Sequence, residues 1–547
     1  MKSILLSSLT KVFKDTEPNF DEFKEFSVLR GEVFNFQIAI FPESDEDCNI
    51  TVEVASNLRD GIKIFKVLDM PSNYPAPEDH DDFHYDTKRT EYPDLLQPIN
   101  EDNTVELTKG EWNCLWFKYI PEMDYIAGTN PITVFLKKGL YDENNKHIFN
   151  LRTIPRQLPM QDLIYTNWFH NDCLCTYYKV EPFSEEYWTL LRNYVKNAVA
   201  HGVNMIYTPV FTPPLDTEVG GERPTFQLVE VEKIDVGYRF SFRNFDKYVR
   251  ICTECGIKYF EISHFFTQWG AKHAPKIMAN VKGIQRQIFG WDTVANGKDY
   301  VQFLAVFAKA FTKEVERLDI KQNCYLHVSD EPNDEQIEDY KNASYIINQL
   351  FPDFHIIDAL SEIEFYRQGI VKTPICGEDV ADTFKAEVEN FWTYYCCCET
   401  HDFLPNRTFA MPPTRNRILG MLLYKYEAKG FLQWGHNFWY TQYSKKHINP
   451  FEVTDAGGAF PSGDSFVVYP GADYKPLNST RHEVFYEGIC DYRAMKYLER
   501  LTSREHVLKI LTKNLDTELT FKNYPHDIEW ILNKRAEINK EIELAIR

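Results

Sequence analysis

The feature that most constrains this chain is the alternation of strand-like and helix-like segments that begins near Leu163. Candidate strands, apolar and rich in β-branched or aromatic residues, occupy residues 163–169, 203–211, 257–264, 323–329, 354–360, 374–377, 391–398 and 430–440. Strands that alternate with helices pair in parallel. Eight such units are the number that closes a (β/α)8 barrel. The sequence therefore predicts an α/β protein built on a TIM-type barrel.

Helix and hairpin signals fill the segments between these strands. The clearest helix has Ser184 as its N-cap, Glu185 and Glu186 in its first turn, and Gly202 at its end. A second helix is predicted over residues 300–318. Residues 227–242 alternate apolar and polar side chains, which predicts a hairpin inserted after the second strand. Such an insertion lies on the C-terminal face of a barrel, where the loops build active sites.

The first part of the chain has a different pattern. Phe34, Phe36, Ile38 and Ile40 alternate with polar or small residues, and similar runs follow at 105–107, 115–119 and 132–136. Short strands with frequent turn signals predict an antiparallel β-sandwich. We expect an N-terminal β-sandwich domain over residues 1–158, a barrel over 159–480 and a C-terminal helical extension over 481–547, with residues 155–159 as a linker.

The charge balance limits the partners of the chain. Its 547 residues include 60 Lys and Arg against 81 Asp and Glu, for a formal net charge of -21. This charge repels phosphate backbones and anionic lipids, so we expect neither nucleic acid nor membrane as a partner. The apolar stretch in residues 1–9 is too short for a secretory signal, which predicts a cytoplasmic protein. The oligomeric state stays open.

Cysteine usage and the absence of nucleotide motifs predict no metal and no cofactor. The 12 cysteines are scattered, apart from the run at 396–398 in a strand-like segment, and free thiols in a reducing compartment fit this pattern. Cys252 and Cys255 form a lone CxxC without the second pair that a zinc site needs. Neither a Walker loop, a GxGxxG turn after a strand, nor a GxSxG elbow is present.

Two adjacent carboxylates, Asp330 and Glu331, follow the fourth predicted strand and precede Pro332. Barrel enzymes carry their chemistry at this end of the strands. Neighbouring residues in a strand point to opposite sides, so both carboxylates serve one pocket only if the chain leaves extended geometry there. Pro332 favours that departure. The alternative is that one of the two carboxylates caps the following helix.

Aromatic and polar side chains collect at other predicted strand ends. Aromatic faces beside Asn and His groups suit a pocket that binds a sugar ring, although a Trp-rich barrel seam is an alternative for each residue. His170, Asp172 and His264 have no metal-ligand spacing, and such histidines more often bind substrate or backbone. The predicted substrate-binding residues are Trp168, His170, Trp269, Tyr394, Trp434, Asn437 and Trp439.

Four segments together resemble glycoside hydrolase family 123 and the related families grouped as domain of unknown function 4091. They are residues 166–170 (TNWFH), 327–332 (HVSDEP), 431–439 (FLQWGHNFW) and 462–471 (SGDSFVVYPG). The resemblance covers about residues 160–500, and the segments occur in the expected order. It implies an N-terminal β-sandwich, a catalytic (β/α)8 barrel and a retaining β-N-acetylgalactosaminidase with a carbohydrate substrate.

The resemblance also implies a substrate-assisted mechanism, in which the 2-acetamido oxygen of the substrate attacks its own anomeric carbon and gives an oxazolinium intermediate. The adjacent Asp-Glu pair of the family maps onto Asp330 and Glu331. Glu331 is then the general acid and base, and Asp330 holds the acetamido N–H. We expect the neighbouring Asp330 carboxylate to raise the pKa of Glu331. Alternatives are a glycosidase for another sugar and a non-catalytic carbohydrate-binding barrel.

Overall fold

The computed structural model describes residues 1–19, 24–121, 127–138 and 145–546. Its first part consists of two five-stranded sheets, and residues 34–40 lie in one of them as the alternating pattern predicts. In sheet order, the first contains β1 (Lys2–Ser7), β3 (Phe34–Phe41), β8 (Asn113–Tyr119), β5 (Ile62–Pro71) and β6 (Glu91–Pro98). The second contains β2 (Glu25–Arg30), β10 (Lys146–Gln157), β9 (Gly128–Lys137), β4 (Asn49–Ala55) and β7 (Thr104–Glu106).

The two sheets pack face to face around one apolar core. Phe36 and Phe117 of the first sheet are fully buried and stack at 4.6 Å, and Phe149 of the second sheet contacts Phe36 at 4.8 Å. The predicted sandwich is therefore present. Two details differ from the prediction. The pair β2 and β10 is parallel, and the residues expected to form a linker continue β10 as far as Gln157.

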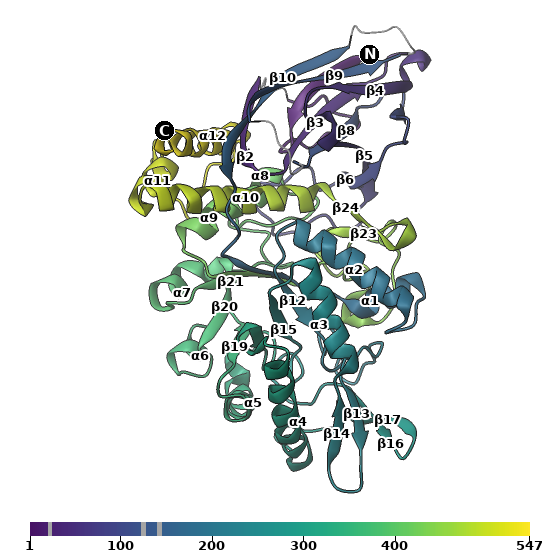
Figure 1. Ribbon diagram of the computed structural model, residues 1–547, viewed down its shortest axis with the longest axis vertical. Helices are drawn as coiled ribbons and strands as arrows, with labels where there is room; N and C mark the ends of the chain where they lie inside the picture. The colour runs from purple at the N-terminus through teal and green to yellow at the C-terminus, as the bar shows by residue number, and fades with distance from the viewer. Residues whose placement is uncertain (20–23, 122–126, 139–144, 547) are drawn as a thin grey trace.

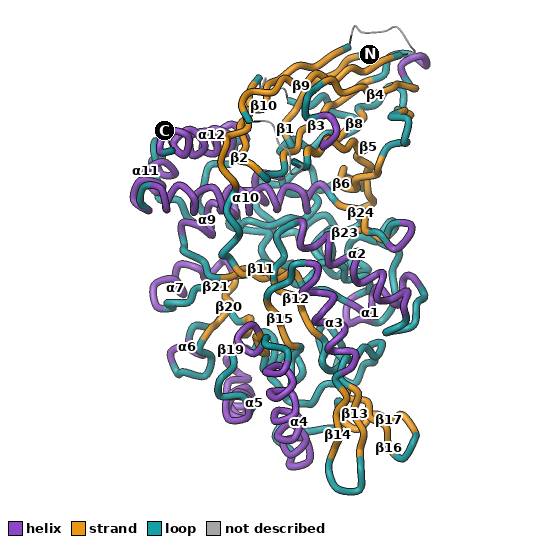
Figure 2. The backbone as a smooth tube through the Cα atoms, viewed as in Figure 1, coloured by secondary structure: helices purple, strands orange, loops and turns teal. Residues whose placement is uncertain are grey.

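The second part is a closed barrel of eight parallel strands, as predicted. In order, they are β11 (Ile164–Asn167), β12 (Met205–Thr208), β15 (Tyr259–Ile262), β18 (Cys324–Leu326), β19 (His355–Ala359), β20 (Thr373–Gly377), β21 (Trp392–Tyr394) and β22 (Gly430–Gln433). Each lies within or beside one of the predicted segments, and most are shorter. Figure 2 shows these short strands leading into long connections.

Helices follow most of the barrel strands. They are α1 (Asn171–Tyr178), α2 (Glu185–Ala200), α3 (Arg243–Cys255), α4 (Lys298–Arg317), α5 (Ile337–Leu350), α6 (Glu364–Arg367), α7 (Ala381–Glu387), α8 (Pro413–Arg417) and α9 (Leu419–Lys425). The predicted N-cap is confirmed, because the Ser184 side chain accepts a hydrogen bond from the backbone N–H of Tyr187. Among the described residues, no helix is long and apolar enough to cross a lipid bilayer.

The predicted hairpin belongs to a larger inserted sheet. It contains β13 (Glu230–Lys233) and β14 (Tyr238–Ser241), and the connection after the third barrel strand adds β16 (Ile277–Val281) and β17 (Ile284–Phe289). After β22, a short hairpin of β23 (Val468–Pro470) and β24 (Pro476–Asn478) leads to three helices, α10 (Thr480–Leu501), α11 (Arg504–Thr512) and α12 (Ile528–Ala545).

Helix α10 joins the sandwich to the barrel. It lies between them in Figure 1 and packs on α8 and α9. Its Arg481 makes two hydrogen bonds to Asp94 of β6, at 2.7 and 2.9 Å. Its Glu483 accepts a hydrogen bond from Lys118 of β8 at 2.8 Å. All four side chains are buried, so two ion pairs lie inside this contact.

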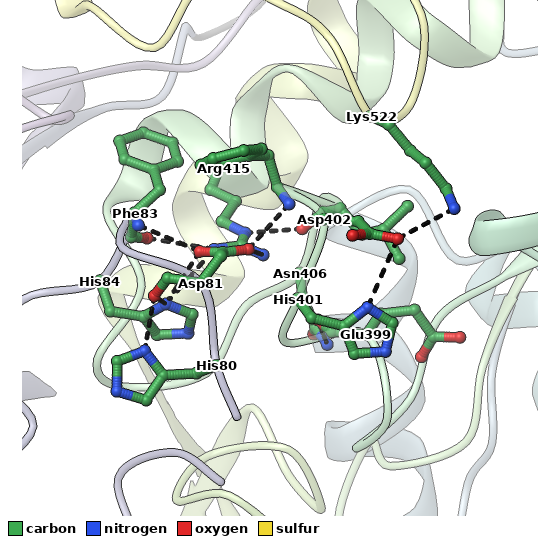
Figure 3. Close-up of polar contacts among 12 residues, drawn as sticks. His80, Asp81, Phe83, His84, Glu399, His401, Asp402, Asn406, Arg415 and Lys522 are labelled. Carbon is green, nitrogen blue, oxygen red and sulfur yellow. Dashed lines mark hydrogen bonds and ion pairs between the residues drawn. The ribbon is translucent and has the colours of Figure 1, made fainter. Parts of the chain in front are cut away.

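A loop of the sandwich also contacts the barrel. The Asp81 carboxylate, in the connection between β5 and β6, accepts two hydrogen bonds of 2.8 Å from Arg415 of α8 (Figure 3). It accepts a third from the backbone N–H of Phe403 at 2.7 Å. The backbone N–H of Asp81 donates to the carbonyl of Thr400. The sandwich therefore holds the connection that follows β21.

Candidate active site

A cavity of about 140 Å³ opens at the C-terminal ends of the barrel strands. Five of the seven predicted substrate-binding residues line it, from connections or strand ends around the barrel: Trp168, His170, Trp269, Tyr394 and Trp434. Both predicted catalytic carboxylates, Asp330 and Glu331, line it as well. The side chains that sequence position placed at strand ends thus converge on one cavity.

The backbone explains how two adjacent carboxylates reach the same cavity. Glu331 has a φ of +43°, in the left-handed region that side chains other than Gly rarely adopt. Its N–H donates to the carbonyl of Ala359, the last residue of β19. The predicted departure from extended geometry is therefore present. Such local strain persists only when the surrounding structure enforces it, and it is common at functional sites.

Neither carboxylate caps the helix that follows. A short 3-10 helix begins at Asp334, and its N-cap residue Asn333 donates its backbone N–H to the side chain of Gln336. Asp330 instead accepts a hydrogen bond from Gln268 at 2.8 Å. Glu331 accepts one from the Tyr394 hydroxyl at 2.8 Å. The capping alternative is thereby excluded, and each carboxylate has its own partner on the cavity wall.

The pKa values of both carboxyls are raised. Burial and the neighbouring Glu331 raise the pKa of Asp330 to about 8, against the opposing hydrogen bond from Gln268. The protein packed around Glu331 raises the pKa of its carboxyl, and the hydrogen bond from Tyr394 opposes this. The pKa of Glu331 is thus raised as expected, but burial is the main cause. Because two adjacent carboxylates repel each other, the pair favours retaining one proton near neutral pH.

Beneath the pair lies a buried network that the sequence analysis did not predict. His327 bonds Glu261 at 2.7 Å through Nε2 and Asp358 at 3.0 Å through Nδ1. Burial alone would lower the pKa of His327, but its hydrogen bonds to Asp358 and Glu261 raise the pKa to about 10. His327 is therefore a cation between two carboxylates. Glu261 also accepts the indole N–H of Trp168 at 2.8 Å, which fixes that ring at the cavity wall.

A second network fixes His170. Arg223 donates to Nδ1 of His170 at 3.0 Å and makes two hydrogen bonds to Asp172, at 2.7 and 3.1 Å. Because an arginine only donates, Nδ1 accepts and Nε2 carries the proton, which it donates to the carbonyl of Trp434 at 2.9 Å. Burial and the Arg223 charge lower the pKa of His170 to about 4, so the ring is neutral. Arg223 and the Trp434 carbonyl thus occupy both ring nitrogens of His170, and Arg223 occupies both carboxylate oxygens of Asp172.

The Trp434 ring is positioned from the loop before β23. Its indole N–H donates to Asp464, a fully buried carboxylate, at 2.9 Å. The next residue is Gly435, where an added Cβ would lie 2.5 Å from the carbonyl oxygen of Ser465. A larger residue there would push the two loops apart, so glycine is required to hold Trp434 over the cavity.

Comparison with known proteins identifies the family. The model of the glycoside hydrolase 123 catalytic domain matches residues 168–498, more than half of the chain. The chain belongs to glycoside hydrolase family 123. A family 123 glycoside hydrolase from Clostridium perfringens, solved in a study of glycolipid glycan hydrolysis, is 15% identical with a TM-score of 0.72, covering 100% of this chain and 98% of that chain. At this identity the likeness shows a shared fold.

Two other glycosidases are similar at much lower scores. A GH10 xylanase from termite gut is 11% identical with a TM-score of 0.32, over 86% of this chain and all of that one. A Parabacteroides merdae β-glucuronidase is 10% identical with a TM-score of 0.31, over 89% of this chain and 52% of that one. These scores are too low to support any inference. No curated protein matches the sequence of this family 123 hydrolase significantly.

Two residues predicted to bind sugar lie outside the cavity of this family 123 hydrolase. The Asn437 amide is fully buried and bonds both the N–H and the carbonyl of His170, at 2.9 and 3.0 Å. The Trp439 ring is also fully buried and packs against Tyr177 and Tyr194. Asn437 shapes the backbone behind His170, and Trp439 belongs to the core.

Other cavity residues were not among the predicted ones: Leu215, Asp216, Ala359, Cys396, Cys397, Leu432, Gln268, Gln442 and Phe460. Most lie in connections whose course the sequence does not encode locally. Glu261 and Asp358 carried a usable signal, because a carboxylate inside an apolar strand segment must have a buried partner. The strand predicted over residues 391–398 was too long, because β21 ends at Tyr394 and Cys396–398 follow it in a turn.

Proposed function

We propose that this glycoside hydrolase removes terminal β-linked N-acetylgalactosamine with retention of configuration, using the 2-acetamido oxygen of the substrate as the nucleophile. The observation that carries the proposal is the convergence of Asp330 and Glu331 on one cavity, held by the separate partners Gln268 and Tyr394. Attack by the acetamido oxygen gives an oxazolinium intermediate, and water then opens it. This chemistry requires an acid and an orienting carboxylate but no enzyme nucleophile.

The two carboxylates have different surroundings that suit different roles. Glu331 is solvent-exposed as a residue and lines the open cavity, although protein packs around its carboxyl group, and this access suits a group that protonates the leaving oxygen. As the acid it donates its proton to that oxygen, and as the base it later removes a proton from the attacking water. Asp330 is only 5% exposed. Its carboxylate accepts the acetamido N–H and stabilises the positive charge that develops on the acetamido group. Trp168, Trp269 and Trp434 offer apolar faces to the sugar.

Leaving-group dependence tests the role of Glu331. An aryl β-N-acetylgalactosaminide with a poor leaving group needs protonation, whereas a dinitrophenyl glycoside does not. Loss of a general acid typically costs about 10²- to 10⁴-fold. We expect Glu331→Gln to lose that much activity on the poor leaving group and far less on the good one. Glu335→Gln, which changes an exposed carboxylate in the same connection, is the matched control. Equal losses on both substrates would refute acid catalysis by Glu331.

A thiazoline mimic of the oxazolinium intermediate tests the role of Asp330. Wild type should bind it tightly, and Asp330→Asn should bind it much more weakly. The same variant should lower the alkaline limit of activity, because removal of the Asp330 charge removes a repulsion that helps the pair hold its proton.

Assays with the gluco epimer and a panel of other glycosides distinguish the two alternatives, a glycosidase for another sugar and a non-catalytic binding protein. Turnover of another sugar without thiazoline inhibition would favour a different glycosidase. Sugar-dependent thermal stabilisation without any hydrolysis would favour a binding protein.

A further inference from the structure

Three consecutive thiols converge beside the cavity. Cys396, Cys397 and Cys398 follow β21, and their sulfur atoms all lie within 4.8 Å of one another. The sulfurs of Cys397 and Cys398 are 3.8 Å apart. In a tetrahedral zinc site, Zn–S bonds of about 2.3 Å place two sulfurs about 3.8 Å apart. The thiols therefore already have the spacing of ligands around one ion.

The backbone that carries the thiols is held in place. Cys396 donates its N–H to the buried Glu399 carboxylate at 2.6 Å. The buried Asn406 amide donates to the carbonyls of Cys396 and Glu399, at 2.7 and 3.0 Å. In Figure 3, Glu399 and Asn406 lie beside the contact between Asp81 and Arg415. A site whose ligands are positioned beforehand binds with less loss of conformational freedom.

The surroundings give an ion access to the thiols. Cys398 is exposed to solvent, and Cys396 and Cys397 line the catalytic cavity. The other described group with a suitable spacing is His264, His327 and Asp358. This second group is less suited to bind an ion, because both ring nitrogens of His327 already form hydrogen bonds, to Glu261 and Asp358.

We propose that Cys396, Cys397 and Cys398 bind one thiophilic divalent ion of the Zn²⁺ and Cd²⁺ class and that the bound ion inhibits hydrolysis. Each thiol that coordinates releases its proton to solvent, so affinity rises with pH. Three thiolates leave a fourth coordination position for water. Because two ligands belong to the cavity wall, the ion and its water narrow the space beside Glu331. The inhibitory part rests on the proposed glycosidase function, and the binding part does not.

Metal binding is tested without reference to activity. The reduced full-length protein is titrated with Cd²⁺, and the thiolate-to-metal charge-transfer absorption and the released protons are measured. We expect one tight equivalent. Loss of outer partners alone weakens metal sites about 10- to 100-fold, so Cys398→Ser, which removes a ligand, should weaken binding at least tenfold. Cys48→Ser and Cys255→Ser change other partly exposed thiols and should bind as wild type. A missing absorption band, or one unaffected by Cys398→Ser, would overturn the site.

Inhibition is tested with the same proteins. Cd²⁺ or Zn²⁺ should abolish glycoside hydrolysis by wild type, and a chelator should restore it. Cys398 does not line the cavity, so Cys398→Ser should keep the basal rate and resist the metal. Full activity of the metal-loaded wild type would overturn the inhibitory role. If no glycoside is hydrolysed even without metal, the proposed function fails, and the absorption titration still decides whether the ion binds.

Discussion

Replacing His327 with glutamine probes the buried charges at the centre of the barrel. His327 lies 2.7 Å from Glu261 and 3.0 Å from Asp358, and all three side chains are 0% exposed. Removing one member of a buried ion pair leaves an uncompensated charge and costs about 3–5 kcal/mol. With an unfolding entropy of about 2.1 cal/mol/K per residue and 547 residues, this loss corresponds to a fall in Tm of about 3–4 °C.

The pH dependence of that loss has a definite sign. Burial lowers the pKa of His327, but hydrogen bonds to Asp358 and Glu261 outweigh it and raise the pKa to about 10. The ordinary pKa of histidine is about 6.5. A group whose pKa is raised by folding contributes its full stabilisation below the unfolded pKa, here about 6.5, and loses it as the pH rises through about 10. The Tm difference between wild type and His327→Gln should therefore shrink from neutral to alkaline pH.

Scanning calorimetry across a pH series measures both quantities. His355→Gln is the matched control, because His355 is an exposed histidine at the start of β19. It should leave the Tm within about 1 °C, as surface substitutions usually do. An unchanged Tm for His327→Gln at neutral pH, or a difference that grows above pH 8, would refute a charged His327 in this network.

Three further substitutions probe the cavity and its support. Tyr394→Phe removes a hydrogen bond to the Glu331 carboxylate, worth about 1.5–3 kcal/mol, so kcat/KM should fall about 10- to 100-fold in steady-state assays. Because that bond lowers the pKa of Glu331, its loss should move the alkaline limit of activity, where the general acid deprotonates, to higher pH. Asp81→Asn weakens the contact with Arg415 and should lower both the Tm and kcat. Trp269→Ala, at a residue 37% exposed, should raise KM several-fold with little change in Tm.

The fold was predictable because the pattern of apolar residues that marks each strand or helix lies within that element's own segment. Every barrel strand lies within or beside a predicted segment, since buried parallel strands are short apolar runs between helices. The predicted strands were too long where the connection after a strand is also rich in buried aromatic residues, as at 434–440 after β22, because such a segment has the same composition as a strand. β17 was missed because its sequence, IQRQIF, is largely exposed and carries little apolar signal. The parallel pairing of β2 with β10 joins distant segments, which no local pattern encodes.

The candidate site was predictable only in part, because contacts with distant parts of the chain decide which side chains line the cavity. Asp330 and Glu331 were found because strand order places them at the barrel mouth and Pro332 favours a change of backbone direction. Whether an aromatic residue lines the cavity or the core depends on packing from other parts of the chain. Trp434 faces the cavity, whereas Trp439, only five positions later in the same segment, is covered by α1 and α2.

The ion pairs between α10 and the sandwich limit whether the sandwich of this hydrolase can be exchanged for another. Arg481 and Glu483 have their counter-charges, Asp94 and Lys118, on the sandwich. A foreign sandwich grafted onto this barrel would need an anion opposite Arg481 and a cation opposite Glu483. A neutral surface of matching shape would leave both charges desolvated, at a cost of several kcal/mol per ion. The two parts are therefore constrained to change together, and exchange between relatives should succeed only where both charge pairs are retained.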